Sequence, residues 1–138
     1  GLYPPGYRQE KPRRDDATFE GLIEAVREAG RALGGDTVYV AGVDLSHVGP
    51  RFGDPPLDAR VKEEIEAIDR EAPAAAARGD ADGWFTSIAA HQDSSRICGH
   101  APVYAMLRCA APGEGRLLDY EQSDEKDGSM VTIAAMAW

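Results

Sequence analysis

The chain has 138 residues, of which 43% are hydrophobic, and 15 basic against 24 acidic side chains give it a formal net charge of -9. This length and apolar content suit one folded domain and argue against a wholly disordered chain. The negative charge repels phosphate backbones and anionic lipid surfaces, and no run approaches the roughly 18 apolar residues of a membrane helix. We therefore expect a cytoplasmic protein with neither nucleic acid nor a membrane as partner.

The first half of the chain predicts a helix followed by a strand. Residues 1–16 are rich in proline and charge and predict an extended arm or loop, ahead of a folded part at 17–138. From Thr18 the apolar residues fall at helical spacing, and the helix is expected to end at Gly34. The apolar, β-branched run at 37–43 is typical of a strand buried on both faces of a parallel sheet. This order indicates an α/β fold with a central, mostly parallel or mixed sheet flanked by helices.

A polar loop at 44–56 follows, and two further helices are expected after it. Asp58 is placed to cap the first of them, which Pro73 should interrupt. The next helix has Asp80 or Asp82 as its cap and should end near His91.

The last third predicts one more helix and two strands. Pro102 suits the first position of the helix, where its missing N–H is not needed, and the two strand-like runs at 115–123 and 129–138 flank a charged turn. Three strands make a thin sheet for four helices. We infer that another segment of polypeptide completes the sheet.

Asp44 and His47 directly follow the predicted buried strand, at the end where ligands of open α/β sheets gather. The two side chains can converge on one point, with the imidazole acting as acid, base or metal ligand. The same spacing fits equally well a turn in which Asp44 caps backbone N–H groups and His47 packs beside Phe52. Arg51 and Asp54 can pair across this loop or form a solvated surface pair.

The chain has two cysteines, too few to indicate a disulfide framework. Cys98 precedes the Pro102 helix, whose backbone N–H groups and dipole should favour a reactive or metal-bound thiolate. His100 can join it, although Cys-x-His alone is not the spacing of a structural zinc site. Cys109 is interpreted as a small core residue, and His91 as a helix C-cap or surface residue.

Several motifs in this order resemble the Memo-like family. They begin with VAGVDLSHVGPRFGD and continue through DGWF and RICGHAPVYAML to LLDYEQS and VTIAAMAW, so the likeness runs from about Asp16 to Trp138. The resemblance implies a fold like that of the class III extradiol dioxygenases, with this chain as the C-terminal half of the domain. It also implies that Asp44, His47 and Cys98 share a pocket at the strand ends.

In the Memo-like family two further histidines from the N-terminal half complete a site associated with iron or copper, and neither can be matched here. The resemblance therefore implies an incomplete metal site whose missing half lies elsewhere. One hypothesis is a redox or oxidase-like metalloprotein in which the Cys98 thiolate and histidines hold iron or copper, with His47 also as acid or base and Asp44 orienting it. The alternative is a non-catalytic module that binds a peptide or small anionic ligand in the same pocket. The sequence does not decide whether the chain is an enzyme.

Overall fold

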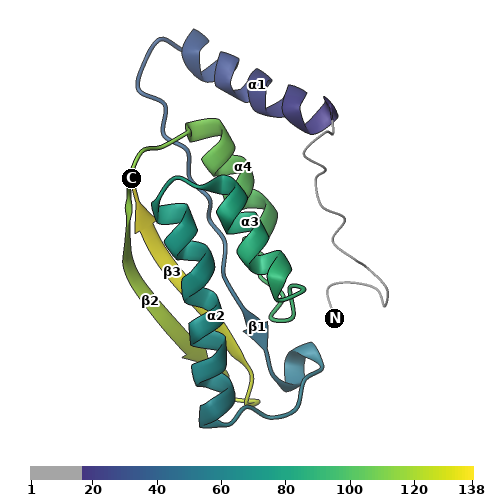
Figure 1. Ribbon diagram of the computed structural model, residues 1–138. Helices are drawn as coiled ribbons and strands as arrows, with labels where there is room; N and C mark the ends of the chain where they lie inside the picture. The colour runs from purple at the N-terminus through teal and green to yellow at the C-terminus, as the bar shows by residue number, and fades with distance from the viewer. Residues whose placement is uncertain (1–16) are drawn as a thin grey trace.

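The computed structural model describes residues 17–138 as helices packed on one side of a small antiparallel sheet (Figure 1). The helices are α1 (Ala17–Ala32), α2 (Ala59–Ala77), α3 (Ala81–Ala90) and α4 (His100–Ala110), with a 3-10 turn, η1, at Pro50–Phe52. The strands are β1 (His47–Val48), β2 (Arg116–Asp124) and β3 (Met130–Ala137), in the order β1-β3-β2. The predicted α/β class is confirmed, and the strands that pair in the described part are antiparallel. The predicted arm at 1–16 lies outside the described residues.

The core lies between the sheet and the layer formed by α2, α3 and α4. Helix α2 packs on β2 and β3, α3 packs between α2 and α4, and α1 contacts α4 at the far end of the molecule (Figure 1). Trp84 is the largest fully buried side chain, and its indole N–H donates to the carbonyl of His100 at 2.9 Å. The main cluster of buried side chains comprises Leu45, Ala72, Ala76, Trp84, Phe85, Ile88, Ile97, Val103, Tyr104 and Leu107.

The predicted helix boundaries hold with two corrections. Of the two predicted caps of α3, Asp80 and Asp82, the structure has Asp80, whose side chain accepts from the N–H of Gly83. Pro73 does not interrupt α2, which runs on to Ala77. A proline removes one hydrogen bond from a helix, and here burial of Pro73 and its alanine neighbours in the core offsets that loss. Helix α4 begins two residues before Pro102, which sits in the first turn, where an N–H is still not required.

The predicted buried strand at 37–43 is wrong. This run is extended, but it is not assigned as a strand, and Val38 and Val40 are 80% and 83% exposed. Pairing with β3 begins only at Leu45, whose N–H donates to the carbonyl of Thr132 at 2.8 Å. Within the described residues, no backbone hydrogen bond joins 37–43 to a neighbouring strand. The run has the composition of a central strand, and the chain as described provides no strand to flank it.

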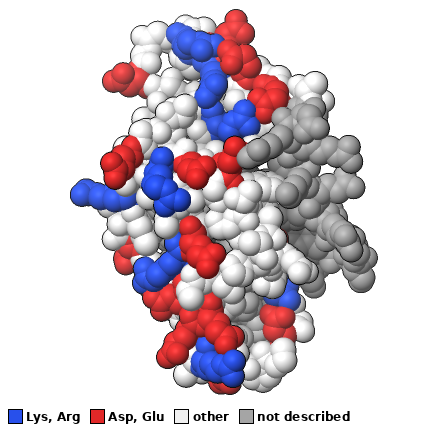
Figure 2. Space-filling view, in the orientation of Figure 1, with Lys and Arg blue, Asp and Glu red and all other residues white. Residues whose placement is uncertain are grey.

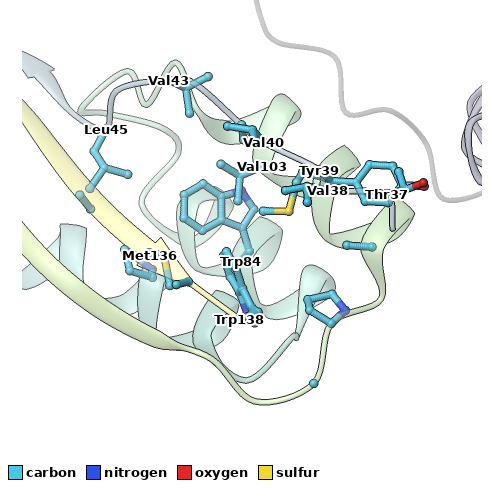
Figure 3. Close-up of a pocket in the computed structure, with 18 residues that line it drawn as sticks. Thr37, Val38, Tyr39, Val40, Val43, Leu45, Trp84, Val103, Met136 and Trp138 are labelled. Atoms are coloured by element: carbon cyan, nitrogen blue, oxygen red, sulfur yellow. The ribbon is translucent and has the colours of Figure 1, made fainter. Parts of the chain in front are cut away.

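A groove of about 630 Å³ lies between the extended run and the end of β3 (Figure 3). Trp84 forms its floor, with Val40 on one side and Met136 and Trp138 on the other. None of the lining residues found for it in the described part carries a charge. The groove is therefore an apolar surface bordered by two stretches of extended backbone.

The charged side chains lie away from this groove, many of them on the outer surface of the helices. Figure 2 shows acidic and basic groups interspersed over the face that carries α2. Ion pairs on this helix, such as Arg60–Glu64 and Arg70–Glu66, join residues that are one helical turn apart. None of the described helices combines the length and apolar character that crossing a membrane requires. The cytoplasmic location stays a prediction.

Candidate metal site

The site forms where the first segment joins the sheet. His47 lies in β1 opposite Val131 of β3, and the N–H of His47 also donates to the carbonyl of Ser95 at 2.7 Å. The loop that contains Cys98 is bound to the same segment, because the N–H of Gly99 donates to the carbonyl of Asp44 at 3.0 Å. Two stretches far apart in the chain are thus held side by side by backbone hydrogen bonds.

This arrangement brings together all three site residues predicted from the sequence. One donor atom each from Asp44, His47 and Cys98 lies within 4.8 Å of the others, and Nε2 of His47 is 3.7 Å from Oδ2 of Asp44. Ligand bonds of about 2.0–2.3 Å allow two ligands of one ion to be roughly 3–4.6 Å apart. Asp44, whose side chain is 51% exposed, has room for the small rotation that closes the set. A carboxylate, an imidazole and a thiol fit a transition-metal ion as a partial ligand set.

The imidazole of His47 is oriented by its other nitrogen. Nδ1 lies 3.0 Å from the carbonyl oxygen of Leu45 and 3.2 Å from that of Arg96. Because carbonyl oxygens only accept, Nδ1 is the nitrogen that donates here, which leaves Nε2, on the side of Asp44, as the position for a metal ligand. Phe52 packs edge-on against the ring at 5.3 Å. The predicted packing of His47 beside Phe52 is confirmed, and it leaves Nε2 in place for the ligand role, which stays a prediction.

Cys98 differs from its prediction in one respect. Its sulfur accepts from the N–H of Asp44 at 3.3 Å, yet burial raises the pKa of the Cys98 thiol above its ordinary value. Loss of hydration thus outweighs the stabilisation of the thiolate by the N–H of Asp44, and the nearby charge of Asp44 raises the pKa further. A bound cation favours a deprotonated sulfur ligand, so the thiolate form depends on occupancy of the site.

A buried carboxylate beneath the site escaped the sequence analysis. Asp69 of α2 is 0% exposed and accepts from Oγ of Ser46 and Oγ1 of Thr132, each at 2.5 Å, and from the hydroxyl of Tyr120 at 3.0 Å. Burial raises the pKa of Asp69, and the three hydroxyl donors oppose that shift. The cluster ties α2 to β2, to β3 and to the residue next to His47. The sequence did indicate that Asp69 is buried, because it falls four residues after Ile65 on the buried face of the helix.

The predicted Arg51–Asp54 pair is also wrong. Asp54 binds the guanidinium of Arg96 through both oxygens, at 2.6 and 2.8 Å, whereas Arg51 points toward Glu125 at 3.9 Å. Oδ2 of Asp54 also accepts from the N–H of Gly49. Gly49 has φ 105°, and a Cβ there would lie 2.6 Å from the Cα of Ser129, so only glycine fits this turn. The loop is shaped by a partner from a distant segment, which spacing could not reveal.

Acid is expected to weaken this ion pair. The guanidinium of Arg96 holds the pKa of Asp54 below its ordinary value of 3.8. A lowered folded-state pKa gives a stabilising contribution that is present above 3.8 and is lost as the pH falls through the folded value. In urea unfolding at a series of pH values, Asp54→Asn should therefore lose less stability than the wild-type chain between about pH 4 and pH 2. Equal acid sensitivity of the two would contradict the assignment.

The remaining candidates lie apart from the cluster. His100 is buried, with its ring 4.3 Å from that of Phe85, and it is not part of the group formed by Asp44, His47 and Cys98. Cys109 is partly buried on α4, and burial raises its pKa. His91 is the C-cap of α3, as predicted, and its Nε2 lies 3.0 Å from Glu71.

The helices, the small sheet and the carboxylate–imidazole–thiol cluster define an α/β protein with a possible metal-binding site. A family model described as Memo-like protein matches residues 12–137. MEMO1 family protein TK1477 of Thermococcus kodakarensis is 30% identical over 130 residues, covering 90% of this chain and 44% of that relative. The chain belongs to the Memo-like family, whose fold is dioxygenase-like, and it spans less than half the length of this relative.

Proposed function

We propose that the chain is the metal-binding part of a redox or oxidase-like protein of the Memo-like family. The observation that carries the proposal is the convergence of donor atoms from Asp44, His47 and Cys98 within 4.8 Å, with Nδ1 of His47 3.0 Å from a backbone carbonyl. A thiolate beside an imidazole selects iron, copper or zinc over magnesium and calcium. When bound, iron or copper supplies one-electron exchange with dioxygen.

The residues of this chain have distinct parts in that proposal. Cys98 and His47 would hold the ion, and Asp44, the most exposed of the three, would complete the set or accept a proton from a bound molecule. Two or three protein ligands leave coordination positions open. We propose that these positions are filled by ligands from the polypeptide that completes the domain and by the substrate.

Elemental analysis of the purified chain tests the proposal, with Cys98→Ala as the test variant and Cys109→Ala as the matched control. Both cysteines are partly buried, but only Cys98 belongs to the cluster. We expect iron or copper in the wild-type chain and in the control, and its loss in Cys98→Ala. Oxygen consumption or superoxide production should follow the metal. Absence of metal from the wild-type chain, even when it is joined to the rest of the domain, would refute the redox proposal.

We further propose that the missing half of the domain, or another chain in its place, covers the groove and the extended run. Val38 and Val40 are exposed although their composition is that of a core strand, and Leu22 on α1 is 57% exposed. A sheet edge with exposed apolar side chains is a surface that proteins usually pair or cover. This surface also supports the alternative function, a binding module, and its uncharged lining favours an extended peptide over a small anion.

Substitution of Val40 is expected to affect this surface without affecting the fold. Because its side chain is 83% exposed, Val40→Asn should change the free energy of unfolding by less than about 0.5 kcal/mol. It should clearly reduce the fluorescence of a neutral hydrophobic dye such as Nile red bound to the groove. Leu118→Asn is the control, since Leu118 is an exposed apolar residue of β2 outside the groove. Equal dye binding by the two variants would show that the groove is not the accessible apolar surface.

A further inference from the structure

Arg96 makes two hydrogen-bond contacts with His47, in addition to the carbonyl of Leu45, which lies 3.0 Å from Nδ1 of the ring. The carbonyl of Arg96 lies 3.2 Å from Nδ1 of His47, and the guanidinium of Arg96 donates to the backbone carbonyl of His47 at 3.0 Å. Arg96 thus contacts both the side chain and the main chain of the same histidine. The carbonyl of the neighbouring Ser95 accepts from the N–H of His47 at 2.7 Å. The backbones of residues 95–96 and of His47 therefore lie side by side.

Arg96 reaches this position in a conformation that its residue type disfavours. Its φ is 56°, in the left-handed region, and Gln92 and Asp93 earlier in the same loop also have positive φ. A non-glycine residue stays in this region when surrounding contacts hold it there. The side chain of Arg96 makes the bidentate pair with Asp54 and donates to the carbonyl of His47, while its backbone N–H donates to the carbonyl of Asp93.

Asp54 connects Arg96 to the loop that follows β1. It lies seven residues after His47, past the turn at η1, and its Oδ2 also accepts from the N–H of Gly49 at 3.0 Å. The side chains of Asp54 and Arg96 are partly buried, at 29% and 37% exposure, and a bidentate pair of this kind fixes direction as well as distance. The backbone hydrogen bonds of Ser95 and Gly99 hold the loop in place, and the ion pair adds the contact that fixes Arg96 within it.

We propose that Arg96 and Asp54 are positioning residues that orient His47 for metal binding. Partners behind a metal-binding histidine fix its tautomer and direction, and their loss typically weakens metal binding by about 10- to 100-fold. This inference rests on the proposed metal site for its consequence, but the orientation of His47 is a property of the chain without metal. Neither residue contacts the ion; both act through the histidine.

The experiment measures the tautomer of His47 and its metal affinity separately. The chain has three histidines, so ¹⁵N spectra of the imidazole nitrogens can be assigned by comparison with a His47→Gln variant. Metal affinity is followed with cobalt(II), whose charge-transfer absorption reports bonding to a thiolate. Asp54→Asn and Arg96→Lys are the mild test variants, and Arg96→Ala is the severe one. Arg51→Ala is the matched control, because Arg51 lies in the same loop without contacting His47.

We expect His47 of the wild-type chain and the control to carry its hydrogen on Nδ1 alone. The test variants should show a mixture of tautomers and about tenfold weaker cobalt binding. The double variant Asp54→Asn/Arg96→Lys should be no worse than the worse single variant, because both changes remove the same contact. If Arg96→Ala does not fold, the results for Asp54→Asn and Arg96→Lys decide whether the pair orients His47.

Two outcomes would overturn the inference. One is a wild-type tautomer together with wild-type cobalt affinity in the test variants. The other is weaker cobalt binding with an unchanged tautomer, which would assign the pair to loop stability alone. If the wild-type chain binds no cobalt even when it is joined to the rest of the domain, the proposed function fails, and the tautomer measurement still decides whether Arg96 and Asp54 orient His47.

Discussion

Replacement of Asp69 by alanine is expected to lower the free energy of unfolding by about 3 kcal/mol. The change removes the acceptor of three hydroxyl groups, those of Ser46, Thr132 and Tyr120, in a cluster where Asp69 itself is fully buried. A buried hydroxyl without an acceptor costs about 1–3 kcal/mol, and a small cavity adds to that cost. Tyr120 keeps the hydrogen bond that its oxygen accepts from Nε2 of Gln122 at 3.4 Å, but its own O–H loses its acceptor.

The measurement is urea unfolding followed by circular dichroism, with two comparisons. Asp69→Asn keeps the shape and one acceptor oxygen, so its loss should be smaller, about 1–2 kcal/mol. Glu63→Ala removes an exposed carboxylate from the same helix and should stay within about 0.5 kcal/mol of the wild-type chain. A loss in Asp69→Ala no larger than that of Glu63→Ala would show that the buried cluster does not stabilise the fold.

Asp69 should also give stability a pH dependence opposite to that of Asp54. Burial raises the folded-state pKa of Asp69 above 3.8, so the folded chain holds this proton more tightly than the unfolded chain. Its contribution is therefore fully present below 3.8 and is lost as the pH rises through the folded value. The Asp69→Asn variant should lack this loss, which the same unfolding series across pH would reveal.

Trp84→Ala is expected to have the largest effect on the fold, a loss of about 3–5 kcal/mol. Trp84 is 1% exposed and lies between α2, α4 and the groove, so its removal leaves a cavity at the centre of the main cluster. It also leaves the carbonyl of His100 without the indole N–H that binds it at 2.9 Å. Because that carbonyl belongs to the first turn of α4, the start of the helix beside Cys98 should become less ordered.

Trp84→Phe separates these two effects. Phenylalanine fills much of the volume but cannot donate, so its cost should be about 1–2 kcal/mol. Trp138→Phe is the control, since Trp138 is 41% exposed although its indole N–H also donates to a backbone carbonyl, that of Ala76. Circular dichroism is the suitable probe, because fluorescence would change with the tryptophans themselves. Similar losses in Trp84→Ala and Trp138→Phe would contradict the central position of Trp84.

Local signals predicted most of the helices correctly. The end of α1 follows from Gly34, which has φ 68° in the structure, and the start of α3 follows from Asp80. These features depend on residues close together in the chain. Continuation of α2 through Pro73 was missed, because it depends on burial against other elements.

The largest error, at 37–43, has a different origin. An apolar, β-branched run indicates that a segment is suited to a buried position between two strands. The described residues provide no strands on either side of 37–43. At the site, the sequence indicated Asp44, His47 and Cys98, which the fold brings together. It did not indicate Arg96 or Asp69, because their roles arise from hydrogen bonds between segments 42 and 63 residues apart.

Cys98 lies far along the chain from the other two candidate ligands, 54 positions after Asp44. An ion bound to both would close a long loop and act as a reversible cross-link between β1 and the start of α4. Such an ion would bind the folded chain better than the unfolded one, so the melting temperature should rise with metal concentration and fall with a chelator. At a free metal concentration 100 times the dissociation constant, the gain is about 2.7 kcal/mol. Metal supply would then control how much of the chain is folded as well as whether it can react.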